Sequence, residues 1–182
     1  MRVIAGKLKG RRLKAPTWEG LRPTSDKLRE TLFNVLASRV EGARVLDGYA
    51  GTGAIGIEAL SRGAAHVTFI EQDRRAAQLI EENLAHCGLS EGYAIIRAPV
   101  QRGLRSLSGD AAFVPFDLVL LDPPYDEPAE RAMQAIETVV SSGSVVVLEH
   151  ARRSPVPARA GVCALRRDLS SGDSALAFYE VA

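Results

Sequence analysis

The segment Asp122-Pro123-Pro124-Tyr125 brings together residue types that can hold a planar amine. It ends the apolar run FDLVLLD at 116–122, which is typical of a buried parallel strand. Because two prolines cannot continue a strand, the chain must turn away and leave their carbonyl oxygens free as acceptors. A carboxylate, a fixed carbonyl and an aromatic face suit an exocyclic amino group on a nucleobase. The amine's lone pair is delocalised into the base, so the protein must supply orientation and electrostatics.

A glycine-rich loop is the second chemical element. Residues 51–56, GTGAIG, match G-x-G-x-x-G and directly follow the short apolar run RVLD at 44–47. The glycines let a ligand approach the backbone, and a following helix offers free N–H groups. Glu71 ends the next apolar run, twenty residues past Gly51, where an acid can hold both ribose hydroxyls. These features suit NAD and S-adenosylmethionine equally.

Asp47, just before the loop, favours S-adenosylmethionine. A dinucleotide places a doubly negative pyrophosphate at the helix N-terminus, and an adjacent carboxylate opposes it. S-adenosylmethionine carries a cationic ammonium and a cationic sulfonium instead. The competing interpretations are a structural cap for Asp47, a rigid turn for the double proline, and an NAD-dependent dehydrogenase for the whole chain.

Strands and helices must alternate to position these residues. Apolar runs of strand length are expected at 44–47, 66–71, 93–96, 116–122 and 144–150. Helices are expected at 54–61, 73–87, 101–107 and 129–140. This order predicts an α/β fold with a doubly wound, mostly parallel sheet. Near the end, VCALRRDL and ALAFYEV flank the turn SSGDS and predict antiparallel C-terminal strands.

A helix and a basic arm precede this alternation. Leu28, Leu32, Val35 and Leu36 recur at helical spacing, and Thr24 or Ser25 can cap that helix. The first sixteen residues carry six cations and no acid. RVIAG and RRLKAP resemble two short strands around the turn KLKG, so we expect a β-hairpin arm at 1–20 and a catalytic domain at 21–182. Such charge indicates either a polyanion contact or a solvated tail.

The bulk properties narrow the class of protein. The chain has 182 residues, 46% hydrophobic and 25% charged, and a net charge of +1. No apolar run approaches the roughly 20 residues that cross a bilayer, and the first residues lack a secretory pattern. Cys87 and Cys163 are expected to be buried thiols of a reducing cytoplasm. The histidines show no metal-ligand spacing, so we expect no metal site. With the absence of a membrane-spanning run and of a secretory pattern, we expect a cytoplasmic monomer without membrane contact.

The DPPY segment resembles the D/N-P-P-Y/F motif of amino-directed S-adenosylmethionine-dependent methyltransferases. Those enzymes modify adenine N6, cytosine N4, guanine N2 or glutamine amides. The whole chain resembles one family, the bacterial 16S ribosomal RNA guanine-N2 methyltransferases of the RsmD type. The matching pieces are MRVIAGKLKGRRLKAP, LRPTSDKLRETLFNVL, VLDGYAGTGAIGIEALSRGA, VTFIEQD, FDLVLLDPPY and GDSALAFYE.

This resemblance implies a class I methyltransferase that uses S-adenosylmethionine to methylate N2 of guanine-966 in 16S ribosomal RNA, within a small-subunit particle. By position, it assigns to the cofactor Asp47, Ala50, Gly51, Gly53, Glu71, Gln72, Ala98 and Asp122. It assigns to the guanine amine Asp122, Pro123, Pro124 and Tyr125. It assigns to RNA Arg2, Lys7, Lys9, Arg11, Arg12, Lys14, Arg22 and Thr24.

Two questions stay open at this level. The residue against the adenine amine is not fixed, because Ala98-Pro99-Val100 replaces the usual acid or amide; a backbone group there or Gln101 are the alternatives. The competing functions are a DNA amino-methyltransferase, acting on adenine N6 or cytosine N4, and a non-catalytic RNA-binding assembly factor. Little sequence outside the catalytic fold remains for a DNA target-recognition domain.

Overall fold

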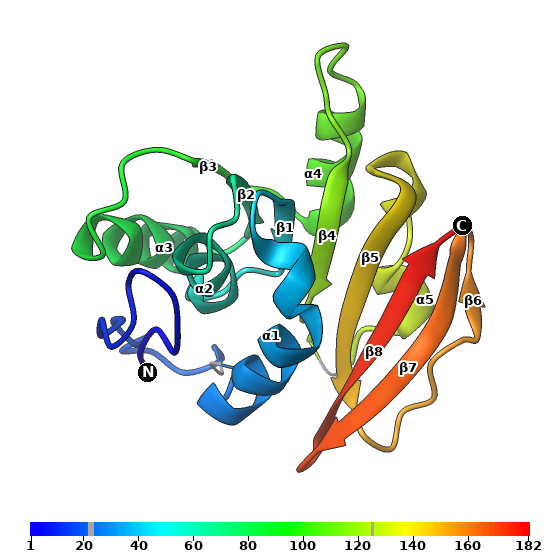
Figure 1. The fold of residues 1–182 in the computed structure, drawn as a ribbon, viewed down its shortest axis with the longest axis horizontal. Coiled ribbons are helices and arrows are strands. Elements are labelled where there is room, and N and C mark those ends of the chain that lie inside the picture. The colour runs from blue at the N-terminus through cyan, green and yellow to red at the C-terminus, as the bar shows by residue number, and fades with distance from the viewer. Residues whose placement is uncertain (22–23, 125) are drawn as a thin grey trace.

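The central feature of the computed structural model is an eight-stranded sheet (Figure 1). The structure describes residues 1–21, 24–124 and 126–182. The strands are β1 Arg44–Gly48, β2 His66–Ile70, β3 Tyr93–Ile96, β4 Phe116–Leu121, β5 Val140–Ala151, β6 Arg159–Ala160, β7 Cys163–Ser171 and β8 Ser174–Val181. Their order is β3-β2-β1-β4-β5-β8-β7-β6, parallel through β5 and antiparallel beyond it. The predicted mixed sheet with antiparallel C-terminal strands is confirmed.

Helices cover both faces of the sheet. They are α1 Asp26–Val40, α2 Ala54–Ser61, α3 Arg74–His86, α4 Val100–Ser108 and α5 Ala129–Ala132, with a 3₁₀ turn at Ile136–Thr138. One apolar core joins α1, α2 and α3 to one face, and a second joins α4, α5 and the 3₁₀ turn to the other. Neighbouring strand residues such as Val45 and Leu46 enter opposite cores, as a strand buried on both faces requires.

Two boundaries differ from the sequence prediction by more than two residues. The helix expected at 129–140 ends after one turn, and Ala135 adopts a left-handed conformation with φ of 66° before the 3₁₀ turn. Strand β5 begins at Val140, where it pairs with Phe116 before an irregularity in the ladder. The helix cap is Ser25, whose hydroxyl accepts the Leu28 N–H at 3.2 Å.

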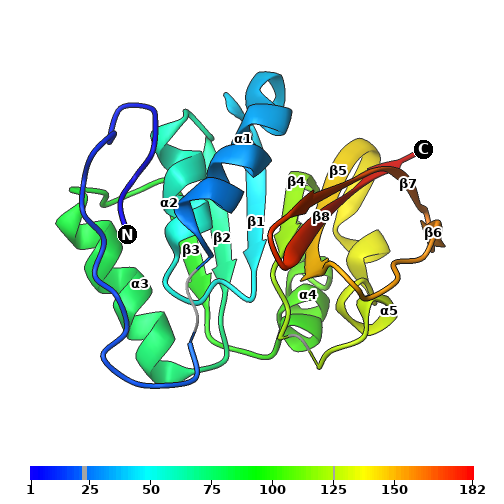
Figure 2. The ribbon, with the colours of Figure 1, turned by 90° about the horizontal axis from the view of Figure 1, so that it is seen from below.

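The predicted β-hairpin at the N-terminus is not formed as two strands. Within residues 1–21, strand-like pairing is limited to an isolated antiparallel bridge between Arg2 and Arg12. Backbone bonds such as Val3 N–H to the Arg11 carbonyl at 2.9 Å flank this bridge. The arm also bonds to α2, since the N–H groups of Ile4 and Ala5 donate to the Glu58 carboxylate at 2.7 and 2.9 Å. Figure 2 shows the arm lying beside α2 and α3.

The arm is also tied to the glycine loop. Buried Asn83 on α3 accepts the Lys14 N–H at 2.7 Å and donates to the Lys14 and Thr52 carbonyls at 3.2 and 3.0 Å. The predicted burial of both thiols is confirmed for Cys87 and Cys163. Among the residues described, none of the helices has the length and apolar character needed to span a bilayer.

Candidate active site

A cleft of about 930 Å³ lies at the carboxyl ends of the parallel strands. Its walls come from the segment before α1, the loop after β1, the end of β2, the start of α4, and the ends of β4 and β5. The turn between β7 and β8 closes one side. Open α/β sheets place their ligands at this edge.

The glycine loop owes its shape to positive φ angles. Tyr49, Gly51 and Gly53 have φ of 61°, 55° and 76°, a conformation that favours glycine. A Cβ on Gly53 would approach Ile80 Cγ2 to 3.1 Å, so a side chain there meets both backbone strain and a close neighbour. Tyr49 is held by its hydroxyl, which donates to Glu127 Oε1 at 2.7 Å.

Two acids at the ends of β1 and β2 hold this loop through its backbone. Glu71, which lines the cleft, accepts N–H groups from Gly51 and Asp73, both at 2.8 Å. Asp47 accepts the Gly56 N–H at 2.8 Å and is 1% exposed. Burial, with the nearby Asp122 and Glu71 carboxylates, raises the Asp47 pKa well above its usual value.

The other residues assigned to the cofactor fall into two groups. Ala50, Gly51, Glu71, Gln72, Ala98 and Asp122 line the cleft, whereas Asp47 and Gly53 lie behind that lining. Val100 and Gln101 also line it. The Gln101 amide is already engaged, because Nε2 contacts the Tyr49 hydroxyl and Glu127 Oε1 at 3.3 and 3.2 Å.

Asp122 stands at the opposite wall, immediately after β4. The Thr24 hydroxyl donates to Asp122 Oδ2 at 2.9 Å, so the segment before α1 reaches the carboxylate directly. Burial raises the Asp122 pKa, and hydrogen bonds from Thr24 and Glu149 partly counter that rise. Pro123 and Pro124 line the cleft beside it. The predicted contacts Tyr125 and Arg22 lie outside the described residues.

Sequence reasoning missed Glu149, at the end of β5. Leu121 pairs with Leu148 in the parallel ladder, so the residues that follow them, Asp122 and Glu149, lie side by side. Both line the cleft, and their side chains are hydrogen-bonded. The available signal was an acid after the apolar run SVVVL, but its importance depends on β5 lying next to β4.

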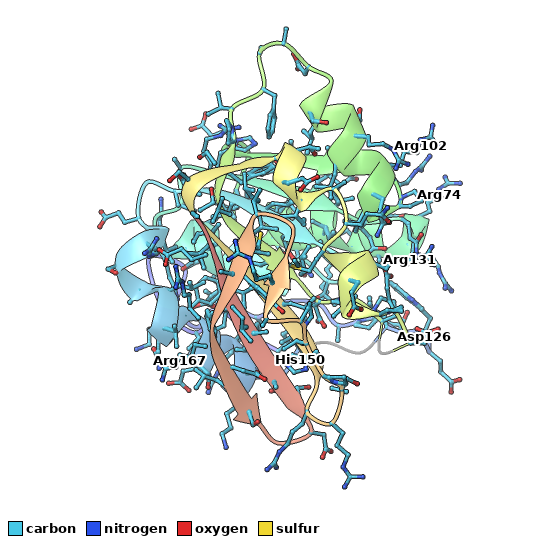
Figure 3. All side chains as sticks on the ribbon, turned by 90° about the vertical axis from the view of Figure 1, so that its right-hand side faces the viewer. Arg74, Arg102, Asp126, Arg131, His150 and Arg167 are labelled. Carbon is cyan, nitrogen blue, oxygen red and sulfur yellow. The ribbon has the colours of Figure 1, made fainter. Side chains whose placement is uncertain are left out.

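The basic residues occupy two separate places. The arm cations Arg2, Lys7, Lys9, Arg11, Arg12 and Lys14 are exposed and none lines the cleft. Lys14 pairs with Glu82 at 2.9 Å. Two unpredicted arginines, Arg75 and Arg131, line the cleft itself, and the Arg75 guanidinium lies 5.0 Å from the Trp18 ring centroid. In Figure 3 the side chains of Arg74, Arg102 and Arg131 project from the same edge of the molecule.

Comparison with known proteins fits this architecture. A family model described as "Conserved hypothetical protein 95" matches residues 1–180. The chain belongs to this family. The chain is 34% identical over 183 residues to the putative rRNA methyltransferase YlbH of Bacillus subtilis, covering 99% of this chain and 98% of YlbH.

Further relatives agree in sequence and in fold. Ribosomal RNA small subunit methyltransferase D of Escherichia coli K12 is 34% identical over 183 residues, with 99% of this chain and 89% of that protein covered. A solved structure titled putative methyltransferase yhhF, from Escherichia coli, has a TM-score of 0.85 at 33% identity, covering 100% of this chain and 97% of that one. The resemblance to RsmD-type methyltransferases and the class I methyltransferase fold are confirmed.

Proposed function

We propose that this protein transfers a methyl group from S-adenosylmethionine to the exocyclic N2 of a guanine in 16S ribosomal RNA, with guanine-966 as the target. Membership of the RsmD-type family supports ribosomal RNA methylation. The observation that carries the proposal is the position of Asp122 and the two prolines. They share one cleft with the glycine loop and Glu71, so a base amine and a methyl donor can meet there.

The charge of the cleft fits a cationic methyl donor. Asp47, Glu71 and Asp122 lie close enough for the other two carboxylates to raise the pKa of Asp47. A bound cation offsets such repulsion, whereas a pyrophosphate adds to it. When bound, S-adenosylmethionine supplies an electrophilic methyl group on sulfur. Glu71 is placed for the ribose hydroxyls, and Ala98 lies where the adenine is expected.

The other wall orients the amine. The Asp122 carboxylate and the Pro123 carbonyl accept the two N2–H bonds, which directs the nitrogen toward the methyl group. Thr24 fixes the plane of the carboxylate through Oδ2. The nitrogen acquires a positive charge as the new bond forms, and it must then lose a proton. The raised pKa of Asp122 makes its carboxylate a better acceptor for that proton.

The exposed arginines and lysines suit the RNA backbone. Contacts from the arm and from Arg75 and Arg131 would position the RNA and make its affinity dependent on salt, without specifying sequence. A guanine in folded RNA must be extruded to reach Asp122. We propose a small-subunit particle containing 16S ribosomal RNA as the partner.

Methyl transfer from labelled S-adenosylmethionine tests the proposal directly. Purified protein is offered unmodified small-subunit RNA, small-subunit particles, and DNA. We expect label in RNA or particles, and mass mapping to place it on N2 of one guanine. Label in DNA alone would support the DNA amino-methyltransferase alternative. RNA binding without transfer to any of the three substrates would support the assembly-factor alternative.

A further inference from the structure

The Asp122–Glu149 pair offers two carboxyl groups to one base. The Leu121–Leu148 register puts their backbones at the same level on neighbouring strands, and both side chains line the cleft. Glu149 is 9% exposed, so water competes weakly for it. A hydrogen bond links the two side chains. A carboxyl group has more lone-pair sites than one hydrogen bond occupies, so both groups keep acceptor capacity.

Acceptors at this position discriminate among the amino-bearing bases. In adenine and cytosine, the ring nitrogen beside the exocyclic amine, on the Watson–Crick edge, has no hydrogen and accepts. In guanine the ring nitrogen N1 beside the N2 amine carries a hydrogen and donates. A site that holds an amine with one carboxyl group and presents an acceptor oxygen of a second beside it matches guanine, because the N2 amine and N1 of guanine both donate.

We propose that Glu149 accepts the N1–H of the target guanine and thereby selects guanine over adenine and cytosine. The inference rests on the proposed function and adds a specificity residue to it. Asp122 and the Pro123 carbonyl then hold the N2 amine, while Glu149 accepts a hydrogen bond only from a base whose neighbouring N1 carries a hydrogen. A base with an acceptor at this position places two lone pairs against each other, which a buried site penalises strongly.

2-Aminopurine separates binding of the amine from recognition of N1–H, because it keeps the 2-amino group and has an unprotonated N1. Single-turnover methylation is measured on RNA, reconstituted into particles where required, with guanine or 2-aminopurine at the target position. For the wild-type protein we expect 2-aminopurine to react about 10- to 100-fold more slowly than guanine. For Glu149→Gln we expect a ratio near 1, because the amide can turn its oxygen to N1–H or its N–H to N1.

The controls isolate Glu149 from other causes. 2-Aminopurine also lacks O6, but a preference based on O6 would leave the ratio unchanged in Glu149→Gln. Glu180→Gln, on β8 at the opposite end of the sheet, should keep the wild-type ratio. Thermal melting and cofactor binding verify that each variant is folded. Glu149→Ala should also lose the preference, because it removes both the acceptor for the guanine N1–H and the lone pairs that oppose N1 of 2-aminopurine.

The outcomes separate the two proposals. If wild-type protein methylates no guanine in RNA or particles, the proposed function fails and this inference fails with it. If guanine is methylated but the wild-type protein accepts 2-aminopurine equally well, only the role of Glu149 is overturned. That role is also overturned if Glu149→Gln retains the wild-type ratio.

Discussion

Two pairs of acids stand at the carboxyl ends of the parallel strands, and they are held in different ways. Asp47 near the end of β1 and Glu71 directly after β2 accept backbone N–H groups of Gly51, Gly56 and Asp73. Asp122 is instead held by side chains, those of Thr24 and Glu149. Backbone donors are fixed by the fold, whereas side-chain donors can turn away. The half proposed for the cofactor is therefore preorganised, and the half proposed for the base is adjustable.

Removing the Asp122 carboxylate should have the largest effect. We expect Asp122→Ala to lower kcat by about 10²- to 10³-fold, because the amine loses an orienting acceptor. Cofactor affinity should change little, since the backbone-held pair is untouched. Single-turnover transfer and calorimetry measure the two quantities. Asp117→Ala, at the other end of β4, is the matched control. If Asp122→Ala lowered cofactor affinity as strongly as kcat, the proposed separation of the cleft into a cofactor half and a base half would be contradicted.

Truncating Glu71 should weaken the half of the cleft proposed to bind the cofactor. We expect Glu71→Ala to weaken S-adenosylmethionine binding by about 10- to 100-fold, because a ribose contact disappears and the Gly51 and Asp73 N–H groups lose their acceptor. Calorimetry checks this, with the exposed Glu81→Ala as control. RNA affinity should be preserved. A variant with wild-type cofactor affinity would refute the assignment of Glu71.

Thr24 tests whether side-chain support matters for the base. Thr24→Val keeps the shape but removes the hydroxyl, and we expect kcat to fall about fivefold, as for the loss of one ordinary hydrogen bond. The Thr24 hydrogen bond lowers the Asp122 pKa, so its loss should raise that pKa further. The acid limb of the pH–rate profile should then move to higher pH. Thr31→Val, at a half-buried position on α1 where the hydroxyl bonds the Lys27 carbonyl, should leave the limb unchanged.

Asp47→Asn should give the smallest change, and its sign is informative. Burial raises the folded-state pKa of Asp47, so its ionisation costs stability as the pH rises above 3.8, and the cost is complete above the raised pKa. Without cofactor, we therefore expect the variant to have the greater free energy of unfolding at pH 7, with no difference below pH 3.8. Denaturant unfolding at several pH values measures this. Destabilisation at pH 7 would mean that the Gly56 hydrogen bond outweighs the buried charge.

Local sequence patterns predict the strands and turns whose own residues mark them, such as apolar runs and prolines. The strand at Phe116–Leu121 is one continuous apolar run, and the turn after it is dictated by two prolines. Alternation of such runs with helices was sufficient for the parallel half of the sheet. Gly51 and Glu71 lie at one cleft, because parallel strands share an edge for their carboxyl ends.

Contacts between distant residues were not predictable in this way. The arm pairs with itself only around the Arg2–Arg12 bridge, and its anchoring by Ile4 and Ala5 to Glu58, more than fifty residues away, has no local signal. Glu149 was considered only as part of a strand, because its neighbour Asp122 is set by the order of β4 and β5. Thr24 was assigned to RNA, and its hydrogen bond to Asp122 depends on how α1 enters the fold.

The sheet order has a consequence for the synthesis of the chain. Strand β8 is made after β5 and β7, yet it lies between them. Until residues 174–181 emerge, the β5 edge that carries Val145 to Glu149 has no antiparallel partner. An unpaired apolar edge is a site of aggregation, so this interval is the vulnerable period of biogenesis. The half of the cleft proposed to bind the base is therefore completed last.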